Sequence, residues 1–424
     1  MKSQSTKGVI IIALSYLPVL LRLTYHYDVW YLYLLKMIVD TSYISFAWLI
    51  ISGFRQGIIR RVLSQSLHGK FHNYLGYLAV GGVLIHPLAY IWLWSDWRII
   101  IPFLHPYGLF ISLGGLAVVI ALITGFSSYF IRKRYYDLWN VLHYLNYVFF
   151  IIIFVHVWQS LPVTSPTAIY YIAIFIFTLG CMVYKWMFDL RLLSFNTTVQ
   201  SITPVAKDTY NVRFKVPPHV DTWDAGEYVM ITMDRMDSHH PFSVSKINDD
   251  QTVEITFKVF GNFTKKFSHV KAGQKLYFAG PFGTANKMVQ YRQNKDLVLL
   301  AGGIGITPFR CITHRLLEQH DARNIYLFYC VSSVDYFAFD EELTALAQRY
   351  PNFKYIKICS QPTTDPTVLQ GYISDTILKR YVGDDLTKHS YMVCGPDPML
   401  AAVNVLLRNN KVPRYQIHRE EFSY

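Results

Sequence analysis

Residues 72–86 read HNYLGYLAVGGVLIH, an apolar stretch with a histidine at each end, and residues 143–156 repeat the pattern as HYLNYVFFIIIFVH. The histidines are fourteen positions apart in the first stretch and thirteen apart in the second. Fourteen residues rise about 21 Å along an α-helix, which fits within the roughly 30 Å hydrocarbon core of a bilayer. Both stretches are therefore expected to be membrane-spanning helices that carry ionisable side chains.

Six segments of the chain are apolar over the roughly 20 residues that a membrane-spanning helix needs. They lie at about residues 8–27, 30–53, 71–94, 107–127, 138–158 and 167–188. The first is interpreted as a retained helix and not as a cleaved signal peptide, because further spans follow it. The chain is 52% hydrophobic and only 16% charged, which is too apolar for a soluble protein. We therefore expect a six-helix transmembrane domain over residues 1–192.

Lysine and arginine gather at alternate ends of these segments, whereas the other junctions hold Arg98 as their one basic residue. The positive-inside rule places the basic ends in the cytoplasm. Both termini and the soluble half of the chain are therefore expected to be cytoplasmic, in a multi-pass protein of the cell membrane. The basic flanks are Lys2, Lys7, Arg55, Arg60, Arg61, Lys70, Arg132, Lys133, Arg134, Lys185 and Arg191.

The net charge of +12 lies largely at these flanks and forms no basic stripe with interleaved aromatic residues, so nucleic acid is not an expected partner. The five cysteines form no C-x-x-C pair, which indicates a reducing compartment.

In this orientation the four histidines form two layers, each with one histidine from the third segment and one from the fifth. His72 and His143 are expected near the inner leaflet, and His86 and His156 near the outer one. Two neutral imidazoles on either side of a flat iron macrocycle form a bis-histidine haem site, which suits electron transfer. The chain has no C-x-x-C-H motif, so two non-covalent, b-type haems are predicted. The alternative is that these histidines only hydrogen-bond between helices.

Two details of this prediction stay open. On a straight helix a spacing of thirteen puts His143 and His156 about 140° apart, so the fifth segment needs a bulge, a bend or long-reaching rotamers. Lys36 and Asp40 lie one turn apart in the second segment. Either they pair with each other, or Lys36 attracts an anionic product or a haem propionate near the outer layer.

Residues 196–290 alternate short apolar strands with turns, which predicts a small antiparallel β-barrel. Three motifs follow one another within it: HPFSVS at 240–245, GNFTKKF at 261–267 and GPFG at 280–283. Thr264 is expected to cap a short helix that turns backbone N–H groups toward a phosphate. Each motif alone is weak evidence for a ligand site, whereas the order and spacing of the three motifs are more specific evidence.

Residues 294–424 alternate strands with amphipathic helices, which predicts a parallel, doubly wound sheet. Ligands of such sheets bind at the carboxyl ends of the strands. The glycine-rich turn AGGIGITP (301–308) and the motif CGPDPM (394–399) both follow predicted strands. The sequence thus predicts a nucleotide-binding α/β domain at the end of the chain.

The order of these five motifs behind six spans with two histidine pairs resembles the NADPH oxidase and ferric reductase superfamily, most of all its compact bacterial NADPH oxidases. The resemblance covers nearly all of the chain. It implies that the barrel binds FAD and that the last domain binds NADPH or NADH. The implied FAD contacts are His240, Pro241, Phe242, Ser243, Val244, Ser245, Gly261, Asn262, Phe263, Thr264 and, stacked on the flavin in preference to Tyr424, Phe422. The implied NAD(P)H contacts are Gly302, Gly303, Ile304, Gly305, Ile306, Thr307, Pro308, Ser332, Cys394, Gly395 and Pro396.

The sequence departs from the family pattern at two places. Members that prefer NADPH usually carry an arginine after the second strand of the last domain, where this chain has Ser332, Ser333 and Asp335. The serines suit a phosphate and the aspartate suits a ribose hydroxyl, so NADPH and NADH both remain open. Eukaryotic oxidases also carry a histidine one turn after the outer haem ligand, where this chain has Tyr90.

The resemblance implies a transmembrane NAD(P)H oxidase that passes electrons through FAD and two haems to extracellular oxygen and forms superoxide. A ferric-chelate reductase with the same electron path is the nearest alternative. A haem-binding membrane subunit that serves a separate enzyme, and a transporter with intramembrane histidines, are alternatives of other classes. No obligatory protein partner is evident beyond the lipid bilayer.

Overall fold

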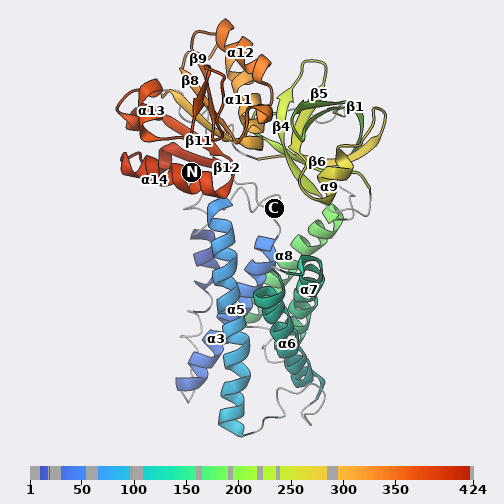
Figure 1. Ribbon diagram of the computed structural model, residues 1–424. Coiled ribbons are helices and arrows are strands. Elements are labelled where there is room, and N and C mark those ends of the chain that lie inside the picture. The colour runs from blue at the N-terminus through green and yellow to red at the C-terminus, as the bar shows by residue number, and fades with distance from the viewer. Residues whose placement is uncertain are drawn as a thin grey trace. The chain divides into compact units, whose positions relative to one another are not determined.

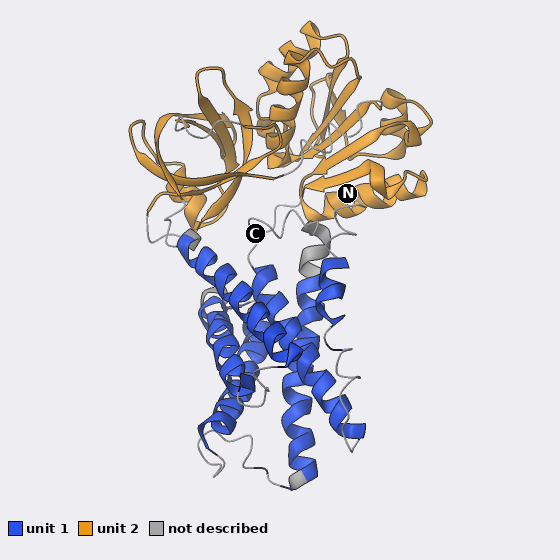
Figure 2. Ribbon diagram, turned by 180° about the vertical axis from the view of Figure 1, so that it is seen from behind, with its two compact units in different colours: residues 1–188 blue, residues 189–424 orange. Residues whose placement is uncertain are grey.

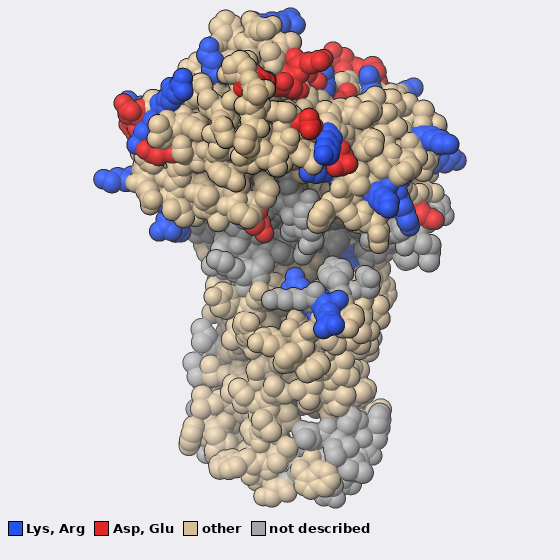
Figure 3. Space-filling view, in the orientation of Figure 1, with Lys and Arg blue, Asp and Glu red and all other residues tan. Residues whose placement is uncertain are grey.

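The computed structural model divides the chain into two compact units, Met1–Phe188 (unit 1) and Asp189–Tyr424 (unit 2), shown in Figure 2. On the face shown in Figure 3, charged side chains gather on unit 2, while unit 1 presents mostly uncharged residues. This contrast fits a membrane domain joined to a water-exposed one. The structure describes residues 10–17, 19, 30–53, 65–95, 97, 108–132, 134–158, 165–189, 194–216, 223–234, 239–283 and 295–420.

Unit 1 is built of long apolar helices. Within its described residues, five helices are long and apolar enough to cross a membrane, and the protein is a multi-pass membrane protein. The helices are α3 (Trp30–Gly53), α5 (Gln65–Trp94), α6 (Leu109–Phe126), α7 (Tyr136–Trp158) and α8 (Pro166–Asp189), with a π-helical turn, η3 (Ser127–Ile131), at the end of α6. The structure therefore gives five spans where six were expected, and the expected first span, at 8–27, lies mostly outside the described residues.

Small side chains let α3 and α5 approach closely. The Ser42 hydroxyl donates a hydrogen bond of 2.7 Å to the Ala79 carbonyl. Gly82 lies opposite, where a Cβ atom would meet the Cβ of Ser42 at 2.5 Å. Small residues at helix contacts are typical of membrane proteins, where close packing takes the place of the hydrophobic effect. The buried carboxylate of Asp40, for which a pair with Lys36 was one of two open alternatives, accepts a hydrogen bond from the Tyr171 hydroxyl of α8.

The first part of unit 2 is a closed barrel of antiparallel strands in the order β1-β2-β5-β4-β3-β6. Its interior is filled by alternate residues such as Val212, Phe214, Ile231 and Ile255, all without solvent exposure. The predicted small antiparallel barrel is confirmed. The elements are β1 (Phe195–Ala206), β2 (Thr209–Lys215), β3 (Tyr228–Thr232), β4 (His240–Ile247), β5 (Thr252–Lys258), α9 (Asn262–Phe267) and β6 (Lys275–Phe282).

The second part of unit 2 is a six-stranded parallel sheet in the order β10-β9-β8-β7-β11-β12, which confirms the predicted doubly wound domain (Figure 1). The sequence analysis missed the short strands β10 and β12. The strands are β7 (Leu297–Gly302), β8 (Ile325–Val331), β9 (Phe353–Cys359), β10 (Val368–Gln370), β11 (Ser390–Cys394) and β12 (Ile417–Glu420). Between and after them lie η4 (Gly303–Gly305), α11 (Ile306–Glu318), η5 (Val334–Tyr336), α12 (Asp340–Arg349), α13 (Asp375–Val382), η6 (Leu386–Lys388), α14 (Asp397–Asn409) and η7 (Arg414–Gln416).

Helices cover both faces of this sheet. Helices α11 and α12 pack on the face that carries Leu297 and Leu299, and α13 and α14 pack on the face that carries Val298 and Leu300. The strands are therefore apolar on both sides, as buried parallel strands require. The α11 face shares one continuous hydrophobic core with the barrel, so the two parts of unit 2 are packed against each other.

Candidate functional site

The four membrane histidines form two pairs between α5 and α7. The ring centres of His72 and His143 lie 6.5 Å apart, and those of His86 and His156 also lie 6.5 Å apart. Each pair joins one histidine of α5 to one of α7, as the sequence predicts. The structure therefore brings together all four residues that the sequence analysis selected in unit 1.

The spacing of both pairs fits a metal bound between them. Two imidazoles that hold one first-row metal ion from opposite sides, each at about 2 Å, have ring centres about 6 Å apart. The observed 6.5 Å matches this value at both pairs. The Nδ1 atom of His86 is buried and has no hydrogen-bond partner among the described residues, which is unusual for a histidine that serves only as a link between helices. The donor set thus fits two haems with two histidine ligands each.

Neighbouring groups orient three of the four rings. His156 Nδ1 lies 2.7 Å from the Phe110 carbonyl of α6. Because a carbonyl can only accept, Nδ1 carries the proton and Nε2 keeps the lone pair that binds a metal. The Ser52 hydroxyl lies 2.9 Å from His72 Nδ1, and the Asn146 amide lies 3.3 Å from His143 Nδ1. The contacts thus fix the tautomer of His156 and place a polar neighbour at Nδ1 of His72 and of His143.

The spacing of thirteen in α7 is accommodated without a bulge. Helix α7 is α-helical from Tyr136 to Trp158, and the π-helical turn of this region lies before it, in η3. His143 and His156 nevertheless reach their partners at the same separation. Of the three solutions that the sequence left open, the bulge is excluded within the described helix.

Gly114 of α6 makes room for the outer pair, because a Cβ atom there would lie 2.7 Å from His156 Cε1 and 2.9 Å from its Nδ1. We expect Gly114→Ala to push this ring aside and to weaken haem binding at the outer pair about 10- to 100-fold, the usual effect of disturbing a ligand's support. Haem titration into haem-depleted protein, followed by absorbance, measures this. Gly125→Ala is the control, since Gly125 lies on the same helix with open space around it. Equal haem affinity of the two variants would contradict the prediction.

In unit 2, the HPFSVS and GNFTKKF motifs lie side by side. The His240 ring of β4 stacks on the Phe263 ring of α9 at 3.8 Å, with 22° between the planes. Phe242 and Phe267 continue this cluster, with ring centres 5.7 Å apart. The structure therefore brings the two motifs that the resemblance assigns to FAD into one site. The aromatic tail residues Phe422 and Tyr424, expected to stack on the flavin, lie outside the described residues.

Thr264 is not the cap of the short helix, contrary to the sequence-based expectation. The N-cap of α9 is Gly261, whose φ of 88° lies in the region that glycine adopts without strain. Thr264 lies inside the helix, and its hydroxyl accepts a hydrogen bond of 2.7 Å from the Phe260 N–H. The threonine therefore holds the turn that leads into α9, and the helix starts three residues earlier than the sequence analysis placed it.

Two of the predicted FAD contacts have their side chains turned into the protein. Val244 lies in the barrel core without exposure. The Ser245 hydroxyl, also fully buried, lies at hydrogen-bond distance, 2.9 Å, from the Thr256 hydroxyl. Only their backbone atoms are therefore free for a ligand, and the Val244 N–H already donates to the Glu227 carbonyl at 2.9 Å.

The two motifs assigned to NAD(P)H meet at the carboxyl ends of neighbouring strands. Ala301 of β7 and Cys394 of β11 are direct partners in the sheet. Their glycines pack backbone against backbone: a Cβ atom at Gly395 would lie 3.0 Å from Gly302 Cα, and one at Gly305 would lie 2.6 Å from the carbonyl carbon of Cys394. The predicted ligand edge of the sheet is therefore present.

Cys394 lies in this edge as a neutral thiol. Burial, and secondly the carboxylate of Glu420, raise the pKa of its thiol well above the usual range. A neutral, buried thiol packs beside a ligand without reacting as a thiolate. Ser332 lies exposed directly after β8, and its carbonyl accepts a hydrogen bond of 3.0 Å from the Gln361 N–H.

The sequence analysis missed the ion-pair cluster of Arg310, Glu254 and Glu342 between the barrel and the sheet domain. One signal was available. Arg310 lies in α11 among residues that are all buried, from Ile306 to Thr313, and an arginine within such an apolar run rarely stays buried unless it is paired.

Comparison with known protein families follows this division of the chain. Residues 40–154, which contain His72, His86 and His143 and end two residues before His156, match the ferric reductase like transmembrane component. Residues 194–302 match an FAD-binding domain, and residues 299–404 match the oxidoreductase NAD-binding domain. The three matches together cover α5, α6, most of α3 and α7, the barrel and most of the parallel sheet, whereas α8 and β12 lie outside them.

Curated relatives share part of the chain. The plasma membrane-associated coenzyme Q6 reductase of Saccharomyces cerevisiae is 26% identical over 205 residues, which are 46% of this chain and 65% of that protein. The electron transfer subunit of dihydroorotate dehydrogenase B (NAD(+)) of Fusobacterium nucleatum is 26% identical over 213 residues, 49% of this chain and 77% of that protein. This chain thus spans somewhat less than two thirds of the length of the yeast relative.

A solved structure supports the fold alone. The flavohemoglobin of Malassezia yamatoensis, at 17% identity and a TM-score of 0.51, covers 78% of this chain and 91% of its own. The family matches carry the assignment. The chain joins a ferric-reductase-like transmembrane component to an FAD-binding and an NAD-binding domain, and this combination places it in the NADPH oxidase and ferric reductase superfamily.

Proposed function

We propose that this protein is a transmembrane NAD(P)H oxidase that moves electrons from cytoplasmic NADPH or NADH, through FAD and two b-type haems, to oxygen outside the cell, with superoxide as the product. Unit 2 and both termini lie in the cytoplasm in this proposal. The topology rests on the basic residues at alternate helix ends, such as Arg132 and Lys185, which the positive-inside rule places on the cytoplasmic side.

The observation that carries the proposal is the equal spacing of the two histidine pairs. Both separations are 6.5 Å, and the pairs lie fourteen and thirteen residues apart along the same two helices. A single pair at this distance has a simple explanation as a contact between helices. Two such pairs, at different depths between the same two helices, instead support a path for electrons across the membrane.

FAD accepts a hydride from a nicotinamide and the haems carry single electrons, and this redox chemistry belongs to the cofactors. The chain's part is to hold and separate them. His72 and His143 hold one haem, and His86 and His156 hold the other. The HPFSVS strand and the α9 turn hold the flavin, and the Gly302–Gly305 turn with Cys394 holds the nicotinamide nucleotide. The resemblance to the family assigns these roles, and the side-by-side placement of the motifs supports them.

The test is a dithionite-reduced minus oxidised absorbance spectrum of purified protein, with haem and FAD quantified per chain. We expect b-type haem bands, two haems and one FAD, and bleaching of the flavin by NADPH or NADH without any added protein. A colourless preparation after expression with ample haem supply would contradict the proposal and would favour a transporter. Haem bands without oxidation of either nucleotide would favour a membrane subunit that serves another enzyme.

A ferric-chelate reductase is the second candidate, and the match of residues 40–154 to the ferric reductase like component favours it. Both candidates share the electron path and differ in the acceptor. Reduction of a tetrazolium dye that superoxide dismutase suppresses supports the oxidase. Faster turnover with a ferric chelate under anaerobic conditions than with oxygen alone supports the reductase.

A further inference from the structure

Arg310 lies in the second turn of α11, directly after the glycine-rich turn that is assigned to NAD(P)H. Its side chain is 4% exposed, although arginine is rarely buried unless it is paired. Helix α11 begins at Ile306, immediately after Gly303–Gly305. Arg310 therefore belongs to the helix that the glycine-rich turn begins, five residues after Gly305.

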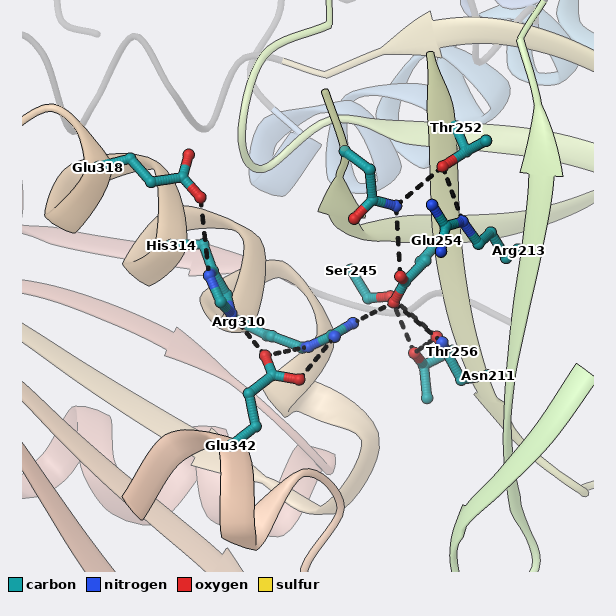
Figure 4. Close-up of polar contacts among 11 residues, drawn as sticks. Asn211, Arg213, Ser245, Thr252, Glu254, Thr256, Arg310, His314, Glu318 and Glu342 are labelled. Atoms are coloured by element: carbon teal, nitrogen blue, oxygen red, sulfur yellow. Dashed lines mark hydrogen bonds and ion pairs between the residues drawn. The ribbon is translucent and has the colours of Figure 1, made fainter. Parts of the chain in front are cut away.

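The guanidinium of Arg310 joins two carboxylates from different parts of unit 2 (Figure 4). Its Nε and Nη2 atoms donate to the two oxygens of Glu342 in α12, at 2.8 and 2.7 Å. Its Nη1 atom donates to Glu254 of the barrel strand β5 at 2.7 Å. The Phe339 ring covers the guanidinium at 3.9 Å. This two-sided contact uses the planar fork of arginine, which lysine does not possess.

The barrel side of this cluster leads to the flavin motif. Glu254 accepts a hydrogen bond of 2.9 Å from Asn211 of β2. The carbonyl oxygen of that amide accepts from Thr256 at 2.8 Å, and Thr256 also bonds the Ser245 hydroxyl at 2.9 Å. Ser245 belongs to the HPFSVS strand and lies where the pairing of β4 with β5 shifts register. A continuous set of polar contacts therefore runs from the flavin motif to the helix of the nucleotide turn.

The charges in this cluster are compensated by ion pairs and hydrogen bonds within the protein. Burial raises the pKa of Glu254, but the charge of Arg310 and hydrogen bonds from Arg310, Asn211 and Asn248 outweigh it and leave the pKa below its usual value. Glu342 likewise has a lowered pKa, because hydrogen bonds from His314 and Arg310 outweigh its burial. Both carboxylates are ionised at neutral pH. Buried ion pairs often add little net stability compared with apolar packing, and their best-attested role is to specify one arrangement.

We propose that Arg310 is a positioning residue for hydride transfer: it locks the nicotinamide turn and α11 against strands β4 and β5, so that nicotinamide and flavin meet at reacting distance. This inference rests on the proposed function, since it requires NAD(P)H and FAD at the assigned motifs. A displacement of about 1 Å away from reacting atoms can slow a reaction about 100-fold. Loss of the lock is therefore expected to change the rate of flavin reduction more than the binding of the nucleotide.

The test compares three full-length proteins by anaerobic stopped-flow bleaching of the flavin with NADPH or NADH. The first variant is Arg310→Lys, which keeps the charge and loses the fork. The second combines Arg310→Met with Glu254→Gln and Glu342→Gln, which removes the arginine and both carboxylates that it bridges together. The control combines Arg213→Met with Asp250→Asn, a pair on the same barrel whose side chains are 36% and 55% exposed.

We expect the limiting rate of flavin bleaching to fall about 10- to 100-fold in both Arg310 variants and to stay within about twofold in the control. The nucleotide concentration for half-maximal rate should stay within about threefold. A second readout needs no activity: in protein stripped of FAD, amide hydrogen exchange should rise together in residues 303–318 and 240–247 of the Arg310 variants and not of the control.

Wild-type bleaching rates in both Arg310 variants would overturn the positioning role. So would a loss of rate that merely follows a loss of FAD, with a normal rate per bound flavin. A wild-type protein that binds FAD but is bleached by neither nucleotide would overturn the proposed function itself, and the positioning role with it. Haem content is measured in the same samples and is expected to stay at two per chain in every variant, since the histidine pairs lie in unit 1.

Discussion

His86→Ala is expected to remove one b-type haem or both from the protein. The substitution takes away one of two imidazoles whose ring centres lie 6.5 Å apart, so that a haem at this pair would be held by His156 alone. His86 Nδ1 has no partner among the described residues, so few protein contacts are lost and the helix is expected to persist. Haem per chain should fall from two to one or none. The rate of reduction of the external acceptor should fall at least about 100-fold, which corresponds to an increase of about 3 kcal/mol in the barrier.

Haem is counted as the pyridine haemochrome, and reduction of the flavin by NADPH or NADH is followed separately. The flavin should still be bleached, because its assigned site lies in the other unit. Tyr77→Ala is the matched control, since Tyr77 lies on the same helix and is 74% exposed within unit 1. Two haems per chain in His86→Ala would refute the assignment of this pair, and an equal loss in Tyr77→Ala would point to general damage of the helix.

Gly305→Ala is expected to abolish bleaching of the flavin by NADPH or NADH, with a fall of at least about 100-fold. A Cβ atom at this position would lie 2.6 Å from the carbonyl carbon of Cys394 and closer still to its oxygen. Both atoms belong to the backbone of β11, which has no flexible end that can move aside. The glycine turn must therefore separate from the Cys394–Pro396 segment, and this opens the edge at which the nucleotide is expected to bind. A shift of this kind can cost about 100-fold in rate.

Gly303→Ala is the control for this substitution. Gly303 has open space around it and a φ of 53°, so alanine there costs about 1–2 kcal/mol of backbone strain and meets no other atom. We expect it to slow bleaching by less than about tenfold. Stopped-flow absorbance measures both variants, with FAD and haem per chain determined in the same samples. Equal rates in the two variants would show that the contact with Cys394 is not what matters.

Much of the architecture was predictable because it depends on local patterns. Apolar runs of the right length predicted five spans close to their observed bounds, including α3 at Trp30–Gly53. Alternating strands predicted the barrel, and strands separated by amphipathic helices predicted the parallel sheet. The histidine positions predicted which residues would face each other between α5 and α7. The tail strand β12 escaped notice because four residues carry too little periodicity to distinguish a strand from a loop.

Other features depend on contacts between residues far apart in the chain. The role of Thr264 inside α9 follows from where the chain enters that helix, and the spacing of thirteen in α7 was settled only by the observed helix and its partners. The cluster of Arg310 joins residues 56 positions apart on one side and 32 on the other. The apolar run around Arg310 indicates a buried, paired arginine, but no local pattern shows which carboxylates pair with it.

The amino-acid order was thus sufficient for the spans, the two sheet types and the pairing of the histidines, since hydrophobic burial acts on short repeats of 2 and 3.6 residues. The tertiary structure alone decided which charges are buried together and which glycines touch backbone. Those contacts arise when separate elements pack, and their energies depend on exact neighbours that a linear chain does not display.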